Sequence, residues 1–106
     1  MLLMKDNIRE FETRFYSRKD LLYDYAWAPY DTKDPRVSGI PGPTAFNRNQ
    51  GREVLYLINA FAQQRGFKSK SSYCKLEKII HLFMPASVRT QDEAIHWIED
   101  NWFNFM

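Results

Sequence analysis

Cysteine and histidine are scarce in this sequence, and their scarcity excludes several kinds of site. One cysteine, Cys74, and two histidines are present among 106 residues. No CxxC, HxxxH, GxxxxGK, GxGxxG or GxSxG pattern occurs, so the common motifs for zinc, phosphate loops and serine nucleophiles are missing. We therefore predict that the protein is not an enzyme and uses neither a metal nor another cofactor.

Long apolar segments are missing as well. The longest apolar-rich run, at 54–62, is far shorter than the ~20 residues that a membrane-spanning helix needs. A lone cysteine cannot form an internal disulfide, and the first four residues are too few for the apolar core of a signal peptide. These absences predict a cytoplasmic protein that does not contact a membrane.

The charges almost balance, but they are unevenly distributed along the chain. There are 15 basic and 13 acidic side chains in total. Residues 65–85 hold five basic and one acidic side chain, whereas residues 86–106 hold one basic and four acidic ones. The basic and acidic segments are either complementary to each other within the fold or two separate binding surfaces.

Two apolar helical patterns, at 49–65 and 72–84, are the clearest structural signals. The first has a wide apolar stripe at three- and four-residue spacing, which predicts the central helix of the core. Gly66 is its predicted end, because glycine tolerates the left-handed backbone that terminates helices. For the second, Ser71 or Ser72 is the predicted N-terminal cap. We expect Leu76, Ile80 and Phe83 to face the first helix, and Lys75, Glu77 and Lys78 to remain in solvent.

Two more helices are predicted, at 7–22 and 91–102. The first places Ile8 and Phe11 on its inner face and Arg18 on its outer face. The second follows a capping box, in which the Thr90 hydroxyl and the Glu93 carboxylate bond to each other's backbone amides. The predicted core of the four helices consists of Phe11, Phe15, Leu55, Ile58, Phe61, Leu76, Ile80, Ile95 and Ile98.

The segment between the first two predicted helices lacks helical periodicity. Residues 23–28 alternate between aromatic and smaller side chains, which predicts an extended arm. Residues 29–47 hold four of the five prolines, which predicts a loop anchored on the core by Val37, Ile40 and Phe46. The predicted fold class is therefore mainly α: a small single-domain four-helix arrangement with a short extended arm and a long Pro/Gly-rich loop.

Aromatic residues are abundant, with 3 Trp, 6 Tyr and 8 Phe. Tyrosine and tryptophan are enriched at the energetic centres of protein interfaces, although an aromatic row also packs across a core. We predict a small binding module that acts through protein–protein contacts, with another protein or with a second copy as a homodimer. The predicted contact residues are Tyr23, Tyr25, Trp27, Tyr30, Trp97, Trp102, Phe103 and Phe105.

A second hypothesis rests on residues 53–84. Here Ala62, Gly66, Tyr73 and Leu76 resemble the helix-turn-helix pattern of DNA-binding proteins, in which a small residue, a turn glycine and two apolar positions join two helices. The stretch between Gly66 and Tyr73 is one residue longer than in that family. The resemblance implies a nucleic-acid partner and a recognition helix at 73–80. The residues that it implies at phosphates or in the groove are Lys68, Lys70, Ser71, Ser72, Lys75 and Lys78.

Two smaller constellations involve a pair of arginines and a cysteine with a histidine. Arg48 and Arg52 flank the start of the central helix, where free amides favour anions, and could hold a phosphate or carboxylate; the alternative is a capped start with arginines in solvent. Cys74 and His81 lie two turns apart, roughly 10 Å along the helix axis, which is too far for a thiol–imidazole pair.

Overall fold

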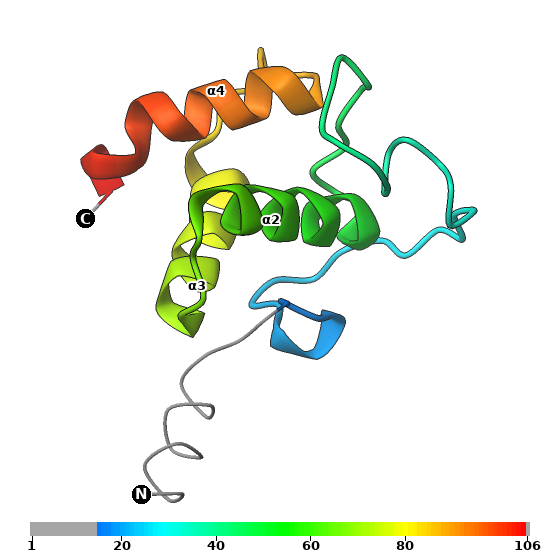
Figure 1. Cartoon of the computed structure of the whole chain (residues 1–106), viewed down its shortest axis with the longest axis horizontal. Helices are drawn as coiled ribbons and strands as arrows, with labels where there is room; N and C mark the ends of the chain where they lie inside the picture. Colours follow the sequence, from blue (N-terminus) through cyan, green and yellow to red (C-terminus); the bar gives the residue numbers. More distant parts are fainter. Residues whose placement is uncertain (1–14, 106) are drawn as a thin grey trace, which may run out of the picture.

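The computed structural model describes residues 15–105, which form three α-helices joined by irregular segments and short turns (Figure 1). The fold is mainly helical, as predicted, and across the described residues the only β-type pairings are isolated bridges between Ala26 and Gln50 and between Ala45 and Thr90. No helix in this range has the length and apolar character needed to cross a membrane. The elements are η1 (Arg18–Asp20), α2 (Gly51–Arg65), α3 (Lys70–Lys78), the π-helical turn η2 (Ile79–Phe83), α4 (Gln91–Asn101) and η3 (Trp102–Phe105).

α2 is the central helix of the core, as its wide apolar stripe predicted. It lies between α4 on one side and α3 with the N-terminal part of the described chain on the other (Figure 1). Leu57 and Ile58 of α2 are completely buried, and so are Leu76 of α3 and Ile98 of α4. The apolar faces of all three helices therefore meet in one core.

Two of the predicted helix ends are confirmed. Gly66 takes the left-handed conformation at the end of α2, with φ of 73°, and the next amide, of Phe67, bonds back to the Ala62 carbonyl at 2.8 Å. At the start of α4 the capping box is present, with the Glu93 amide donating to the Thr90 hydroxyl. The cap of α3 is different from the prediction. Ser69 caps this helix by accepting from the Ser72 amide, so the assignment to Ser71 or Ser72 was wrong.

The first predicted helix is not confirmed. Residues 7–14 lie outside the described range, and residues 15–22 form only the short turn η1. The Asn59 side chain explains this, because it accepts a hydrogen bond from the Tyr16 amide at 2.7 Å and donates to the Tyr16 carbonyl at 3.0 Å. These bonds replace the helical ones. Tyr16 is consequently buried, whereas Phe15, which was predicted in the core, is 59% exposed.

Two other apolar positions are exposed against expectation. Ile40 is 86% exposed and therefore does not anchor the loop, and Phe83 is 51% exposed and does not face α2. The π-helical turn accounts for the exposure of Phe83. Its bond from the Met84 amide to the Ile79 carbonyl spans five residues, one more than in an α-helix, and so changes the direction of the side chains at the end of the turn. Met84 fills the core in its place.

Glu77, which was expected in solvent, is completely buried on α3. Its carboxylate accepts hydrogen bonds from the backbone amides of Leu22 (2.9 Å) and Tyr23 (3.2 Å). It also accepts from the hydroxyl groups of Tyr16 (3.1 Å) and Tyr25 (2.8 Å). One buried carboxylate therefore fastens the chain segment at 16–25 to α3, and four donors compensate its charge.

A second buried polar side chain fastens the segment that precedes α2. The Gln91 amide group, at the start of α4, accepts from the Gly42 amide at 3.0 Å and donates to the Pro35 carbonyl at 3.1 Å. Close by, the amide of the buried Phe46 donates to the Arg89 carbonyl at 2.8 Å. The residues from 35 to 46 are thus bonded to the beginning of α4.

Candidate functional site

The aromatic side chains of the arm, residues 23–28, and the adjacent Tyr30 lie against the helices and are only partly exposed. Tyr25 donates to Glu77, Tyr30 donates to the Glu53 carboxylate at 2.6 Å, and the Tyr23 ring stacks on His81 with centroids 3.9 Å apart. Trp27 packs on the first residue of α2. The row therefore packs across α2 and α3, which leaves little of it available as a flat contact surface.

The C-terminal aromatic residues are divided between the core and the surface. Trp102 packs between the core and Phe67, with ring centroids 5.1 Å apart, and the Lys75 amine lies over its ring at 3.9 Å. Phe105 stacks on the exposed Phe83 at 4.6 Å and also contacts Trp97. Phe103 is 77% exposed. Part of the predicted contact cluster thus remains at the surface.

An open pocket of about 350 Å³ lies beside the Phe83–Phe105 stack; we call it the C-terminal pocket. Its lining is largely apolar and includes Lys75 and Lys78, and so joins part of the predicted aromatic cluster to part of the predicted basic cluster. Sequence reasoning missed Phe83 here because it assigned that residue to the core. The pocket is lined by Ser71, Cys74, Lys75, Lys78, Ile79, Phe83 and Phe105.

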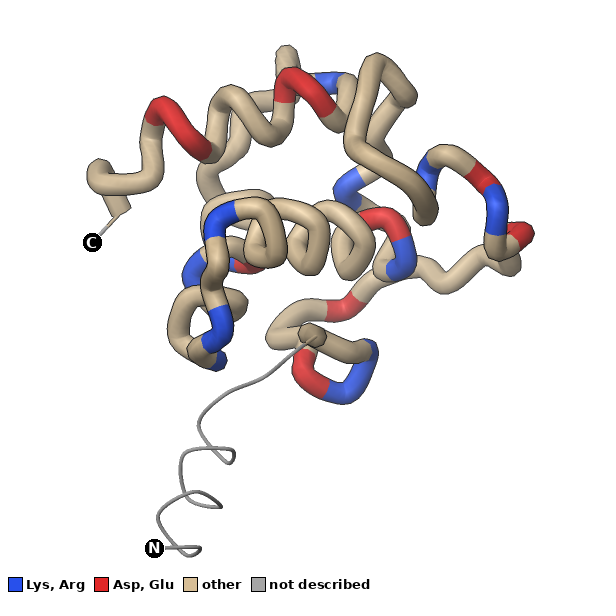
Figure 2. The backbone as a smooth tube through the Cα atoms, in the orientation of Figure 1, with Lys and Arg blue, Asp and Glu red and all other residues tan. Residues whose placement is uncertain are grey.

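The basic and acidic segments form different surfaces that meet at one ion pair. Lys and Arg gather around the turn between α2 and α3, whereas α4 contains Asp and Glu but neither Lys nor Arg (Figure 2). Arg65 pairs with Glu99 at 2.5 Å, so the two surfaces are joined within the chain. Lys68, Lys70 and Lys78 are exposed, as is Ser71, and the Ser72 hydroxyl bonds to that of Ser69.

The two arginines predicted to hold an anion have different environments. The Arg48 guanidinium donates to the carbonyl groups of Ile80 at 3.3 Å, Met84, and Pro85 at 2.7 Å, and so satisfies carbonyls left free at the end of η2. Burial lowers the pKa of Arg48. Its donors are directed at the chain itself, which does not favour an anion site there. Arg52, by contrast, is exposed and lines a cavity.

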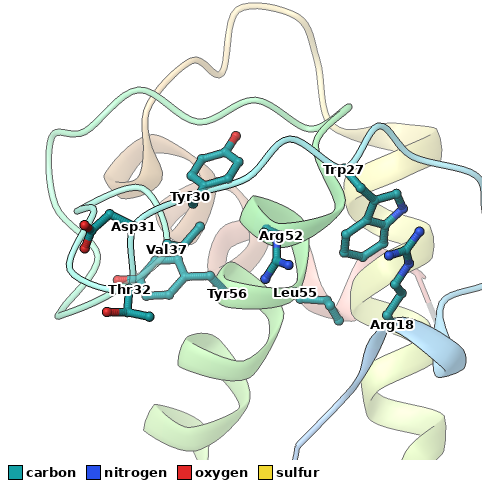
Figure 3. A pocket seen from close by; sticks show the side chains of 9 residues that line it. All are labelled: Arg18, Trp27, Tyr30, Asp31, Thr32, Val37, Arg52, Leu55 and Tyr56. Atoms are coloured by element: carbon teal, nitrogen blue, oxygen red, sulfur yellow. The ribbon is translucent and has the colours of Figure 1, made fainter.

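This cavity, which we call the arm cavity, has a volume of about 420 Å³ and lies between the arm, the following loop and α2. Arg52 projects from α2 between Tyr56 on one side and Trp27 with Arg18 on the other (Figure 3). The Arg18 guanidinium lies over the Trp27 ring, 4.1 Å from its centroid. The residues that line the cavity are Arg18, Trp27, Tyr30, Asp31, Thr32, Val37, Arg52, Leu55 and Tyr56.

The wall of the arm cavity depends on the absence of a side chain at Gly51. A Cβ atom at this position would lie 2.3 Å from the Trp27 ring, which is impossible without displacing the indole. We expect Gly51→Ala to lower the free energy of unfolding by about 1–3 kcal/mol, the range for overpacked sites, although alanine favours helices elsewhere. Urea unfolding measures this.

A double-mutant cycle identifies the cause of this destabilisation. In a chain that already carries Trp27→Ala, the Gly51→Ala change has no indole to displace and is expected to be neutral or slightly stabilising. An equal loss of stability in both backgrounds would show that the indole does not determine the effect.

Cys74 and His81 have separate partners. The Cys74 sulfur lies 3.4 Å from the Tyr16 hydroxyl, and His81 stacks on Tyr23. Within residues 15–105, no group of three or more His, Cys, Asp or Glu side chains is arranged to hold a metal ion. No protein-family model, curated protein or solved structure matches the chain.

Proposed function

We propose that the chain is a protein-binding module whose contact surface is the C-terminal pocket, and that its partner contributes an acidic segment with an apolar anchor. The main support for this proposal is the Phe83–Phe105 stack, in which Phe83 remains 51% exposed beside an open pocket. Aromatic anchors next to pockets dominate the energetics of protein interfaces, because their burial removes a large apolar area from water.

Charge favours an acidic partner over a neutral one. The exposed Lys78 lines the pocket beside Lys75, whose amine lies over Trp102, and the lysines of the preceding turn are close by in the chain (Figure 2). Complementary charges accelerate association and select the partner. A second copy of the chain is a less favoured occupant, because the acidic α4 would have to reach this pocket while Glu99 is already paired with Arg65.

A peptide-display selection with the full chain as bait tests the proposal. We expect the selected peptides to combine aromatic or aliphatic residues with Asp and Glu, and Phe83→Ser to weaken their binding at least tenfold. Leu82→Ser is the matched control, because Leu82 is similarly exposed (55%) but lines a different pocket. Peptides that bind wild type and Phe83→Ser equally would contradict the proposal, and a dimeric mass in solution that Phe83→Ser reduces to a monomer would identify self-association.

Nucleic-acid binding through α3 is the second candidate. It is favoured by the exposed Lys68, Lys70 and Lys78 around α3, although Lys75 is directed onto Trp102. Affinity for a random-sequence duplex that falls steeply between about 50 and 200 mM salt would support this function over the first, because such a dependence reports counterion release from phosphates.

A further inference from the structure

We infer that the arm cavity binds a small molecule that carries both an anionic group, a phosphate or carboxylate, and a flat ring. This inference is independent of the proposed protein contact, because the arm cavity and the C-terminal pocket share no lining residue. It goes beyond the pair of arginines predicted from sequence, since Arg48 is directed elsewhere and Arg18 takes its place.

The anionic group is inferred from two guanidinium groups that face one cavity. Arg18 and Arg52 come from segments far apart in sequence, and neither has a carboxylate within ion-pair distance among residues 15–105. Two other arginines of this range are paired with carboxylates, Arg36 with Asp34 at 2.7 Å and Arg65 with Glu99, and Arg48 donates to backbone carbonyls. Guanidinium groups hold phosphate and carboxylate through two parallel hydrogen bonds, so these two groups, which have no carboxylate partner among residues 15–105, favour an anion.

The flat ring is inferred from the aromatic walls. Tyr56 donates its hydroxyl to the Gly39 carbonyl at 2.6 Å and Tyr30 donates to Glu53, so both rings are held in fixed orientations without a ligand. Leu55 and Val37 add apolar surface to the same cavity. Walls that are aromatic, apolar and already oriented favour stacking with a planar ligand at little cost in side-chain entropy.

The size and the remaining polar groups define the ligand class further. A volume of about 420 Å³ falls within the range of small-molecule pockets, and a nucleoside monophosphate matches it in chemistry. Asp31 and Thr32 also line the cavity and can accept hydrogen bonds from ligand hydroxyl or amino groups. One carboxylate against two guanidinium groups leaves the lining with a net charge of +1, which still attracts an anion.

Calorimetric titration of the full chain with matched probes tests the inference. The probes are AMP and UMP, which carry ring and phosphate, adenosine, which lacks the phosphate, and ribose 5-phosphate, which lacks the ring. We expect AMP or UMP to bind at least tenfold more tightly than either partial probe, because both halves of the cavity are then occupied. If neither nucleotide binds at millimolar concentration, or if ribose 5-phosphate binds as tightly as they do, the inference is wrong.

Charge-matched variants locate the binding. Arg52→Gln is expected to weaken nucleotide binding at least tenfold, whereas Arg89→Gln removes an exposed arginine that lines a different pocket and is expected to leave affinity unchanged. Arg52 has no ion-pair partner in the described range, so its substitution should preserve the fold, which circular dichroism verifies. Equal weakening by both variants would indicate a general charge effect and would overturn the assignment to this cavity.

Discussion

Replacing Glu77 by leucine is expected to lower the free energy of unfolding by about 3–5 kcal/mol, a large fraction of the stability of a chain of this size. The carboxylate is completely buried, and the substitution leaves its donors without an acceptor in the interior. These donors are the amides of Leu22 and Tyr23 and the hydroxyl groups of Tyr16 and Tyr25. Unpaired buried donors lose their full solvation, which an apolar replacement cannot return.

A conservative variant and a surface control test whether the loss of stability comes from the buried carboxylate. Glu77→Gln retains the shape and one acceptor oxygen but turns an NH₂ group toward donors, so we expect a smaller loss of about 1–3 kcal/mol. Glu99→Gln removes a carboxylate whose partner, Arg65, is at the surface, and should change stability by less than about 1 kcal/mol. Urea unfolding of the three variants measures the differences. A Glu77→Leu protein as stable as Glu99→Gln would mean that the carboxylate does not hold the 16–25 segment.

Substitution of Glu77 is also expected to affect the candidate ligand site in the arm cavity. Arg18 and Trp27 form one side of the arm cavity, and their chain segment is fastened to α3 by Glu77. A loosened segment would separate these side chains from Arg52 on α2. Any affinity of the arm cavity should therefore fall in Glu77→Gln, although Glu77 does not line the cavity.

Most features with local causes could be predicted from the sequence, although the cap of α3 is Ser69 and not Ser71 or Ser72. The apolar spacing of α2, the left-handed cap at Gly66 and the Thr90–Glu93 capping box each depend on residues within one or two turns of each other. For the same reason α4 was placed within one residue of its observed limits. No knowledge of distant segments was needed for any of them.

Features that depend on distant partners could not be predicted in this way. Glu77 lies four residues after Tyr73 and three before Ile80, so its spacing places it on the buried face of α3, and only its charge assigned it to solvent. Donors more than 50 positions away make its burial favourable. Asn59 likewise replaces helical bonds at Tyr16, 43 positions away. Polar side chains in the core are therefore the main source of error here, because a hydrophobic pattern assigns every charged residue to the surface.

For the candidate sites, too, local features could be predicted from the sequence and long-range contacts could not. Arg52 was predicted to hold an anion because it is near a helix start, but Arg18 was placed on the outer face of a helix that does not form. The arm cavity joins an arm, a loop and a helix, and their relative position depends on the buried bonds of Glu53 and Glu77. Residue types were thus predictable, and their grouping was not.

The fold is also expected to lose stability steeply as the pH rises above 10. Burial, together with the neighbouring Glu77 carboxylate, raises the pKa of the hydroxyl groups of Tyr16 and Tyr25 well above the ordinary value of 10.0. Burial and the bond to Glu53 raise the pKa of Tyr30 to about 12. All three hydroxyl groups donate to buried carboxylates, and a tyrosinate could not donate.

Stability falls with rising pH because the pKa values of these tyrosines are higher in the folded chain than in the unfolded chain. Below pH 10 these tyrosines are protonated in both the folded and the unfolded chain, so their hydrogen bonds contribute fully to stability. Above pH 10 the unfolded chain releases the protons while the folded chain retains them, and the free energy of unfolding falls by about 1.4 kcal/mol per pH unit for each such tyrosine. For Tyr30 this decline ends near its folded pKa of about 12.

Unfolding by urea at a series of pH values, with tyrosinate absorbance recorded in parallel, measures this decline. We expect stability that is nearly constant from pH 8 to 10, and tyrosinate that appears together with unfolding above it. Tyr25→Phe should be less stable at pH 8, because it lacks one bond to Glu77, but its stability should fall less steeply above pH 10. A slope as steep as that of the wild type would show that Tyr25 ionises equally in both states, and that its bond to Glu77 does not hold the arm on α3.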